Sequence, residues 1–204
     1  MPDQLWLPNP PDGTAICLGF DGSVNNDHTA FGAETMDGYS FTPRWGPNSV
    51  ATHWNPIEHG ERIPHSEVET ALGEMFDRFE VVRVYCDPQD WETDIEAWAL
   101  AHGEEKVVQW PTNKVERMYP AIRRFEADLR EGLIRHDGCP VAAAHIGNAK
   151  KVGKPGQKYL LGKPNETQKI DVAMTRIIAH EAKSDALAAG WEPRRPRRVR
   201  VWRG

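Results

Sequence analysis

The segment Ile16-Cys17-Leu18-Gly19-Phe20-Asp21-Gly22-Ser23 decides the fold, because it is a short apolar run that ends in an aspartate. Such a run, bounded by a turn, predicts a buried β-strand with Asp21 at its carboxyl end. The apolar run at 81–85 leads into Cys86-Asp87-Pro88 in the same way. A third aspartate, Asp171, lies in the second turn of a helix that we expect late in the chain. Two strands and one helix thus each present an aspartate.

The elements around these aspartates alternate between strands and helices. The chain is expected to open as an antiparallel meander with strands at about 14–21 and 28–36, an Asp37-Gly38 turn and a third strand from Tyr39. Residues 43–65 are expected to be irregular, and residues 150–164, rich in Lys, Gly and Pro, to form a mobile basic loop. The other expected elements are helices at 66–79, 91–101, 116–131, 140–149 and 165–189, and strands at 81–86, 106–110 and 133–134.

This order of elements predicts an α/β fold, a mixed sheet of five or more strands with helices on both faces. The first strand and the strand at 81–86 should be parallel neighbours. Parallel neighbours end at the same edge of a sheet, so Asp21 and Asp87 should lie side by side. The carboxyl edge of an open α/β sheet is where ligands bind.

A cluster of three carboxylates at that edge is typical of a site for two divalent cations. Hydrolysis of a phosphodiester by two metals needs hard oxygen ligands for Mg²⁺ or Mn²⁺, with the ions about 3.5–4 Å apart. Asp21, at the end of the central strand, is placed to bridge both ions, while Asp87 would hold one and Asp171 the other. Taken alone, Asp21 and Asp87 are each explained by a turn or a cap, the common role of an aspartate after a strand. Asp171, however, lies beside an apolar stripe in what we expect to be a helix interior, where aspartate has poor propensity.

Composition limits the class of protein. The chain has 204 residues, of which 39% are apolar and 27% charged, as in ordinary soluble domains. We expect a Pro-rich linker at 1–13, one domain at 14–189 and a flexible basic tail at 190–204. The chain contains no run of about 18 apolar residues, so no transmembrane helix is predicted. The N-terminus does not resemble a signal peptide. The three widely spaced cysteines argue against a disulfide framework or a zinc ribbon and favour buried thiols of a cytosolic protein.

Charge is unevenly distributed along the chain. Residues 150–204 carry 14 Lys and Arg against 5 Asp and Glu, a net charge of +9, whereas residues 1–149 carry −14. An acidic body with a basic C-terminal third suits a protein that binds metals with one part and a polyanion with the other. The lysines proposed to contact nucleic acid are Lys150, Lys151, Lys154, Lys158, Lys163 and Lys169. The alternative is that these lysines are simply solvated.

Other polar residues of the chain give weaker indications of metal binding. Asp27 and Asp90 are candidates for auxiliary metal ligands. His53, His59 and His65 recur at intervals of six residues, which is not the spacing of a zinc site. We therefore expect ordinary loop histidines there, and a structural role for His145.

The same residues resemble the C-terminal nuclease domain of the large terminase subunit of tailed bacteriophages. The resemblance covers about 14–185 and rests on Leu18–Ser23, Asp27–Ala30, Tyr85–Pro88, His145–Ala149 and Lys169-Ile170-Asp171. It implies an RNase H-like fold, two Mg²⁺ or Mn²⁺ ions on Asp21, Asp87 and Asp171, and cleavage of double-stranded concatemeric viral DNA during packaging.

The resemblance also implies partners and a location. The partners would be a terminase ATPase domain, a small terminase subunit and a portal, in the cytoplasm of the infected bacterial host. One departure is that the phosphate-binding loop of the family's ATPase domain has no match here, because Gly153-Lys154 and Gly162-Lys163 are each followed by proline. ATP-driven translocation is therefore not expected of this chain.

Three alternative functions remain. A Holliday-junction resolvase of the same fold would also use clustered acids. A non-catalytic DNA-binding or docking module would have a degenerate site, although all three acids are present here. A sugar kinase or actin-like ATPase begins with a similar strand and turn, but needs about twice this length and a second Gly-rich phosphate loop.

Overall fold

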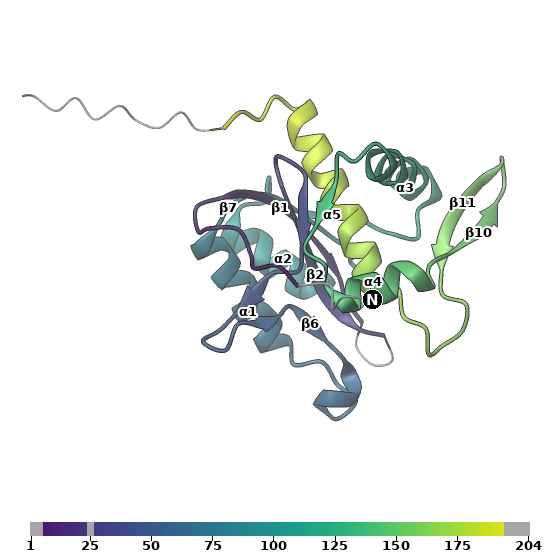
Figure 1. Ribbon diagram of the computed structural model, residues 1–204. Helices are drawn as coiled ribbons and strands as arrows, with labels where there is room; N and C mark the ends of the chain where they lie inside the picture. The colour runs from purple at the N-terminus through teal and green to yellow at the C-terminus, as the bar shows by residue number, and fades with distance from the viewer. Residues whose placement is uncertain (1–5, 24–26, 194–204) are drawn as a thin grey trace, which may run out of the picture.

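One mixed sheet forms the centre of the molecule (Figure 1). The computed structural model describes residues 6–23 and 27–193; the start of the expected linker and most of the expected basic tail lie outside these residues. The strand order is β8-β7-β1-β2-β3-β9, and β6 also pairs with β2. The strands are β1 Ala15–Asp21, β2 Thr29–Thr35, β3 Tyr39–Phe41, β6 His53–Trp54, β7 Glu80–Cys86, β8 Val107–Gln109 and β9 Arg135–His136.

The pairing confirms the expected topology. β1 pairs antiparallel with β2 and parallel with β7, and β2 pairs antiparallel with β3 across the turn at Asp37-Gly38. The seven strands satisfy the expectation of five or more. The short strand expected at 133–134 was misplaced, because the residues that pair with β3 are Arg135 and His136.

Helices cover both faces of the sheet (Figure 1). They are α1 His65–Arg78, α2 Glu92–His102, α3 Val115–Arg130, α4 Pro140–Asn148 and α5 Asp171–Ala188. The stretch expected to be irregular at 43–65 contains β6, the 3-10 helix η1 Pro56–His59 and the small sheet of β4 Arg44–Trp45 and β5 Val50–Ala51.

Strand β1 is buried on both faces, because successive side chains point to opposite sides of a sheet. Ile16, Leu18 and Phe20 pack into the core that includes residues of α1 and α2. Cys17 packs into the core formed with α3 and α5. Gly19 and Asp21 share the second face, so the side chain of Asp21 points to the side of α5.

Two glycines let α5 lie close against the sheet. Gly19 and Gly32 are paired residues of β1 and β2. A Cβ built on Gly19 would lie 2.8 Å from the backbone nitrogen of Ala179 and closer still to the carbonyl oxygen of Thr175. A Cβ on Gly32 would lie 2.6 Å from the hydroxyl of Thr175. Only glycine fits this pair, and the pair fixes where α5 sits on the strands.

This close packing sets the height of Asp171. Asp171 precedes Thr175 by four helix residues, which rise about 6 Å. Asp21 follows Gly19 by two strand residues, which rise about 6.6 Å. With Thr175 seated on Gly19, the two aspartates therefore come to the same level at the carboxyl edge of the sheet.

The mobile basic loop expected at 150–164 is instead a β-hairpin. β10 Lys150–Lys154 pairs antiparallel with β11 Lys158–Gly162, and Gly156 occupies the turn with φ of 75°. Tyr159, Leu160 and Leu161 pack against the core of α3 and α5. These three apolar residues were overlooked because lysines surround them in the sequence. Burial of their side chains offsets the entropy cost of ordering the segment.

The final helix begins later than expected. Asn165 does act as a cap, since its Oδ1 accepts hydrogen bonds from the backbone N–H groups of Thr167 and Gln168. It caps a turn, however, because the Asn148 side chain donates to the carbonyl of Lys169 at 2.9 Å. The helix starts at Asp171, which is therefore its first residue and not a member of its second turn. Aspartate is favourable at this terminus because the helix dipole stabilises negative charge there.

The described part of the N-terminal extension is attached to the domain. The backbone N–H of Leu7 donates to the carbonyl of Asp137 at 2.7 Å, and the Asn9 side chain donates to the carbonyl of Thr42 at 3.0 Å. Over residues 6–23 and 27–193, no helix combines the length and apolar character needed to cross a bilayer. The three cysteines are buried and unpaired.

Candidate metal centre

The three predicted aspartates line one cavity at the carboxyl edge of β1 and β7. The cavity has a volume of about 360 Å³, and a water molecule occupies about 30 Å³, so hydrated cations fit. Its polar lining residues include Asp21, Ser23, Asp27, Asp87, Gln89, Thr112, Asn113, Lys163 and Asp171. The structure thus brings together side chains that are 66 and 84 positions apart in the sequence.

Asp21 and Asp87 owe their placement to the parallel pairing. The backbone N–H of Asp87 donates to the carbonyl of Phe20 at 2.9 Å, which extends the β1–β7 ladder to the site. The hydroxyl of Thr112 donates to Asp87 Oδ2 and holds this carboxylate in place. Thr112 had no signal in the sequence, because it lies in the loop after β8 and only the sheet order brings it to β7.

The crowded carboxylates raise one another's pKa. Burial raises the pKa of Asp21 well above 3.8, and Asp171, Asp87 and Asp27 add to the rise. Burial also raises the pKa of Asp171 to about 6. The pKa of Asp87 is raised by burial, although the hydrogen bond from Thr112 opposes the rise. Without a bound cation, the ionised forms of these three carboxylates therefore destabilise one another.

The residues fit divalent cations. Asp171 is 8% exposed, and its Oδ2 is buried without a hydrogen-bond partner in the described structure. An unpartnered buried carboxylate oxygen is costly unless a cation or a donor satisfies it. Carboxylate oxygens are the ligands that Mg²⁺ and Mn²⁺ prefer. The donor set thus suits divalent cations of this kind.

The pKa of Asp171 predicts how stability depends on pH without metal. A folded-state pKa raised from 3.8 to about 6 gives stability that is present at low pH and is lost as the pH rises through about 6. The metal-free protein should lose about 1–3 kcal/mol of unfolding free energy through this group between about pH 4 and pH 7. Asp171→Asn should remove this loss in urea unfolding at each pH. The exposed Asp77→Asn should leave it unchanged, and an unchanged profile in Asp171→Asn would contradict the assignment.

Asp27 joins the site to two of the predicted lysines. Lys169 Nζ lies 2.7 Å from Asp27 Oδ1, and Lys163 Nζ lies 2.9 Å from the same oxygen. Burial alone would raise the pKa of Asp27, but the hydrogen bonds from Lys169 and Lys163 lower it. Asp27 is therefore negative and holds both lysines beside the carboxylates. Asp90, the other auxiliary candidate, is exposed and does not line the cavity.

The other four lysines lie on the hairpin, which extends away from the body of the domain (Figure 1). Lys151 pairs with Glu126 at 2.9 Å, and Lys158 pairs with Glu116 at 2.6 Å, so both tether the hairpin to α3. Lys150 and Lys154 lie on one face of β10, because residues four apart in a strand point the same way.

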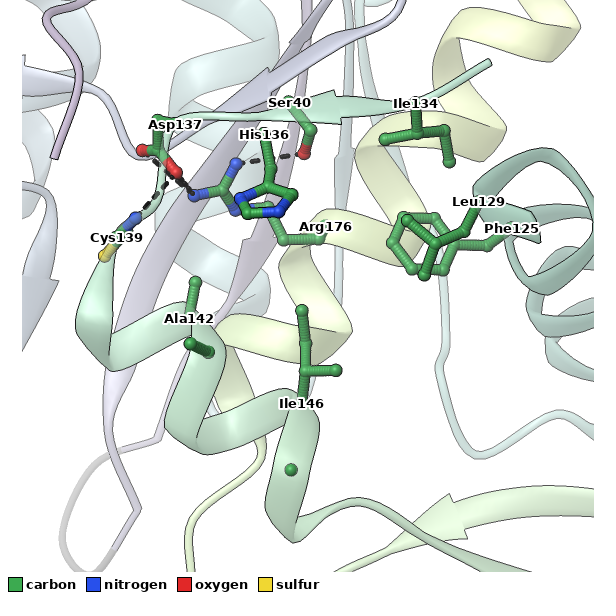
Figure 2. A pocket seen from close by; sticks show the side chains of 12 residues that line it. Ser40, Phe125, Leu129, Ile134, His136, Asp137, Cys139, Ala142, Ile146 and Arg176 are labelled. Atoms are coloured by element: carbon green, nitrogen blue, oxygen red, sulfur yellow. Dashed lines mark hydrogen bonds and ion pairs between the residues drawn. The ribbon is translucent and has the colours of Figure 1, made fainter. Parts of the chain in front are cut away.

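A second cavity lies between α3, α4 and α5 (Figure 2). Its lining is mainly apolar, with Phe125, Leu129 and Ile146 among the contributors. At its base Arg176 pairs with Asp137 at 3.1 Å and donates to Ser40 at 2.9 Å. These contacts pair Arg176 with Asp137 and help to hold β3 to α5. Among the described residues that line this cavity there is no acid cluster like that of the first.

No protein-family model matches the chain. The Gene 13 proteins of Mycobacterium phages D29 and L5 are 31% and 30% identical to it over 187 residues. Each match covers 86% of this chain and 30% of the relative, so the chain spans less than a third of the length of these curated relatives.

Solved structures share the fold. The large terminase nuclease from thermophilic phage G20c with bound magnesium matches with a TM-score of 0.64 and 13% identity, over 87% of this chain and 92% of that one. The HK97 bacteriophage large terminase matches with a TM-score of 0.62 and 19% identity, over 88% of this chain and 41% of that one. The Thermus phage P74-26 large terminase nuclease domain matches with a TM-score of 0.59 and 13% identity, over 86% of this chain and 89% of that one. The expected RNase H-like arrangement is thereby confirmed, and the chain has the fold of the nuclease domains of phage large terminases.

Proposed function

We propose that this chain is the nuclease domain of a tailed-phage large terminase, a metal-dependent endonuclease that cuts double-stranded viral DNA concatemers during genome packaging. The observation that carries the proposal is the convergence of Asp21, Asp87 and Asp171 on one cavity of this fold. The G20c nuclease was solved with bound magnesium and with bound cobalt, which supports the use of divalent cations by this chain.

Each side chain has a distinct part in the proposed reaction. Bound Mg²⁺ or Mn²⁺ would supply an activated water and stabilise the leaving oxygen of the phosphodiester. Asp21, half-buried at the end of the central strand β1, is the ligand suited to both ions, while Asp87 and Asp171 would each hold one. Thr112 is a positioning residue, because its hydrogen bond fixes Asp87.

The lysines are suited to the DNA backbone. Lys163 and Lys169, held by Asp27, flank the carboxylate cavity, and a scissile phosphate would compete with Asp27 for them. The hairpin that carries Lys150 and Lys154 continues this positive charge away from the cavity. Such a track binds double-stranded DNA by neutralising phosphates and releasing counterions.

The hairpin gives a testable prediction. Lys150→Glu and Lys154→Glu should each weaken binding of duplex DNA and lower the slope of log K against log salt by about 1. Fluorescence anisotropy in an Asp21→Asn background measures binding without cleavage. Lys106→Glu makes the same charge change next to the amino end of β8, and it should leave affinity unchanged. Equal losses in all three variants would show that the hairpin has no special role.

The proposal also gives this domain its partners and location. A terminase ATPase domain, a small terminase subunit and a portal would act with it in the cytoplasm of the infected bacterium. The two Gly-Lys pairs are the candidates for the phosphate-binding loop of an ATPase. Gly153-Lys154 lies in β10, and Gly162 is the last residue of β11 with Lys163 directly after it, so neither pair forms a phosphate-binding loop before a helix. ATP-driven translocation is therefore assigned to other parts of such proteins.

Incubation with supercoiled plasmid tests the activity. With Mn²⁺ the protein should nick and then linearise the plasmid, and EDTA should prevent both. Equal cleavage of a linear duplex and a four-way junction fits a packaging nuclease, whereas cleavage of the junction alone would favour a resolvase. No cleavage by the folded protein with either Mn²⁺ or Mg²⁺ would favour a non-catalytic DNA-binding module.

A further inference from the structure

Three histidines from separate segments meet beside the carboxylate cavity. His28 precedes β2, His53 begins β6 and His145 lies in α4. The pairing of His53 with Ala30 in the sheet brings β6 next to His28. One nitrogen from each of the three rings lies within 4.8 Å of the others. The spacing of six residues in the sequence gave no hint of this cluster, since its members are 25 and 92 positions apart.

The geometry resembles that of imidazoles around one ion. Zinc–nitrogen distances of about 2.0–2.1 Å put two nitrogens of a tetrahedral site about 3.4 Å apart and their ring centres about 5 Å apart. Here His53 Nε2 lies 2.7 Å from His28 Nδ1. The ring centres are separated by 4.7 Å for His28 and His53, 5.3 Å for His28 and His145, and 5.9 Å for His53 and His145. The observed separations bracket the expected ones.

The chemistry of the cluster favours a metal that binds nitrogen. None of the three rings makes a hydrogen bond to a carboxylate in the described structure. Burial and the charge of Lys169 lower the pKa of His28, although the charges of Asp27 and Glu58 oppose this. Burial lowers the pKa of His53 and of His145 to about 4; His28 and His145 add to the effect on His53, and His28 and Lys169 add to the effect on His145. Neutral imidazoles are the form that ligates metals. An all-nitrogen set suits Zn²⁺, whereas the neighbouring carboxylates suit Mg²⁺ or Mn²⁺.

His145 connects the cluster to the helix that carries Asp171. The backbone N–H of Val172 donates to His145 Nδ1 at 3.1 Å. This nitrogen therefore presents the lone pair that a metal needs, and a bound metal would compete with the Val172 amide for it. Since Val172 follows Asp171, occupancy of the cluster and the position of the third carboxylate are linked.

We propose that His28, His53 and His145 form a site for one Zn²⁺ ion, separate from the pair of ions on the aspartates. The ion fastens the segment before β2, strand β6 and helix α4 to one another at the rim of the carboxylate cavity. Three protein ligands leave the fourth position of a tetrahedral ion for water. The adjoining cavity, which Asn55, Asn148 and Lys169 line with others, has space for that water molecule.

Zinc binding is measurable without any cleavage. The 204-residue chain with both Asp21→Asn and Asp171→Asn is stripped with EDTA, dialysed and titrated with Zn²⁺ against a chromophoric chelator. One Zn²⁺ per chain should bind, and Co²⁺ should give the strong visible absorption of a tetrahedral site. Loss of an outer-shell partner already costs about 10–100-fold in metal affinity, so His28→Ala and His53→Ala should each cost about 100-fold or more.

The controls separate this site from the aspartates and from general damage. His59→Ala changes a histidine of η1 outside the cluster and should retain full affinity. Zn²⁺ should raise the melting temperature of the Asp-variant chain but not of its His53→Ala derivative. Stoichiometric binding that survives His28→Ala and His53→Ala would overturn the proposal, and so would failure of the folded chain to bind Zn²⁺. Neither result would affect the plasmid test of nuclease activity.

Discussion

Replacing Asp21 by asparagine is expected to lower Mn²⁺-dependent plasmid cleavage by about 1,000-fold or more, while making the metal-free protein more stable. Activity falls because Asp21 is the ligand assigned to both ions. Stability rises because burial and the carboxylates of Asp171 and Asp87 raise the pKa of Asp21, so its ionised form opposes folding at neutral pH. Cleavage rate and urea unfolding in EDTA, both at about pH 7.5, measure the two effects.

A matched substitution separates the site from its surroundings. Asp90→Asn makes the same chemical change at an exposed position with φ of 64°, which asparagine tolerates. It should leave both cleavage and stability unchanged. Retained cleavage in Asp21→Asn, or an equal loss in Asp90→Asn, would contradict the assignment of Asp21.

Gly19→Ala is expected to destabilise the fold by about 3 kcal/mol or more, at the upper end for overpacked cores. The new Cβ would overlap the backbone of α5 at Thr175 and Ala179, which cannot move aside like a flexible side chain. Displacing α5 also moves Asp171 away from Asp21. Cleavage should therefore fall even where the variant remains folded, which circular dichroism establishes.

Gly73→Ala is the control for this substitution. Gly73 lies inside α1, and a Cβ there meets nothing within 4 Å. Alanine should stabilise this helix by about 0.5–1 kcal/mol. If Gly19→Ala were as stable as the unsubstituted protein, the close packing of α5 against β1 at Gly19 would be contradicted.

The sheet was predictable because its signals are local. The apolar run ending at Asp21 and the one ending before Asp87 each formed a strand, and their parallel pairing followed from the order of elements. The Asp37-Gly38 turn joined β2 to β3 as expected. In each case the pattern within a few residues agreed with the tertiary packing.

Other elements depended on contacts distant in the sequence. The hairpin of β10 and β11 is anchored by Tyr159 and its two neighbours against α3 and α5, which lysine-rich local sequence conceals. The start of α5 is set by Asn148, which takes the carbonyl of Lys169. The helix propensity of the residues around Asn165 could not reveal this hydrogen bond from the end of α4, which competes with an earlier start of the helix.

The candidate site was found in part. The sequence pointed to the three aspartates, and the structure places them on one cavity, while their catalytic role stays a prediction. Thr112 and the cluster of His28, His53 and His145 were missed. Their positions follow from the pairing of β8 with β7 and of β6 with β2, which no spacing in the chain encodes.

Anomalous X-ray scattering from a crystal soaked in Mn²⁺ tests the central claim most directly. We predict two peaks about 3.5–4 Å apart, with Asp21 between them, Asp87 at one and Asp171 at the other. A crystal of Asp21→Asn should lose both. Absence of any peak among the three aspartates, with manganese bound elsewhere in the molecule, would contradict the account.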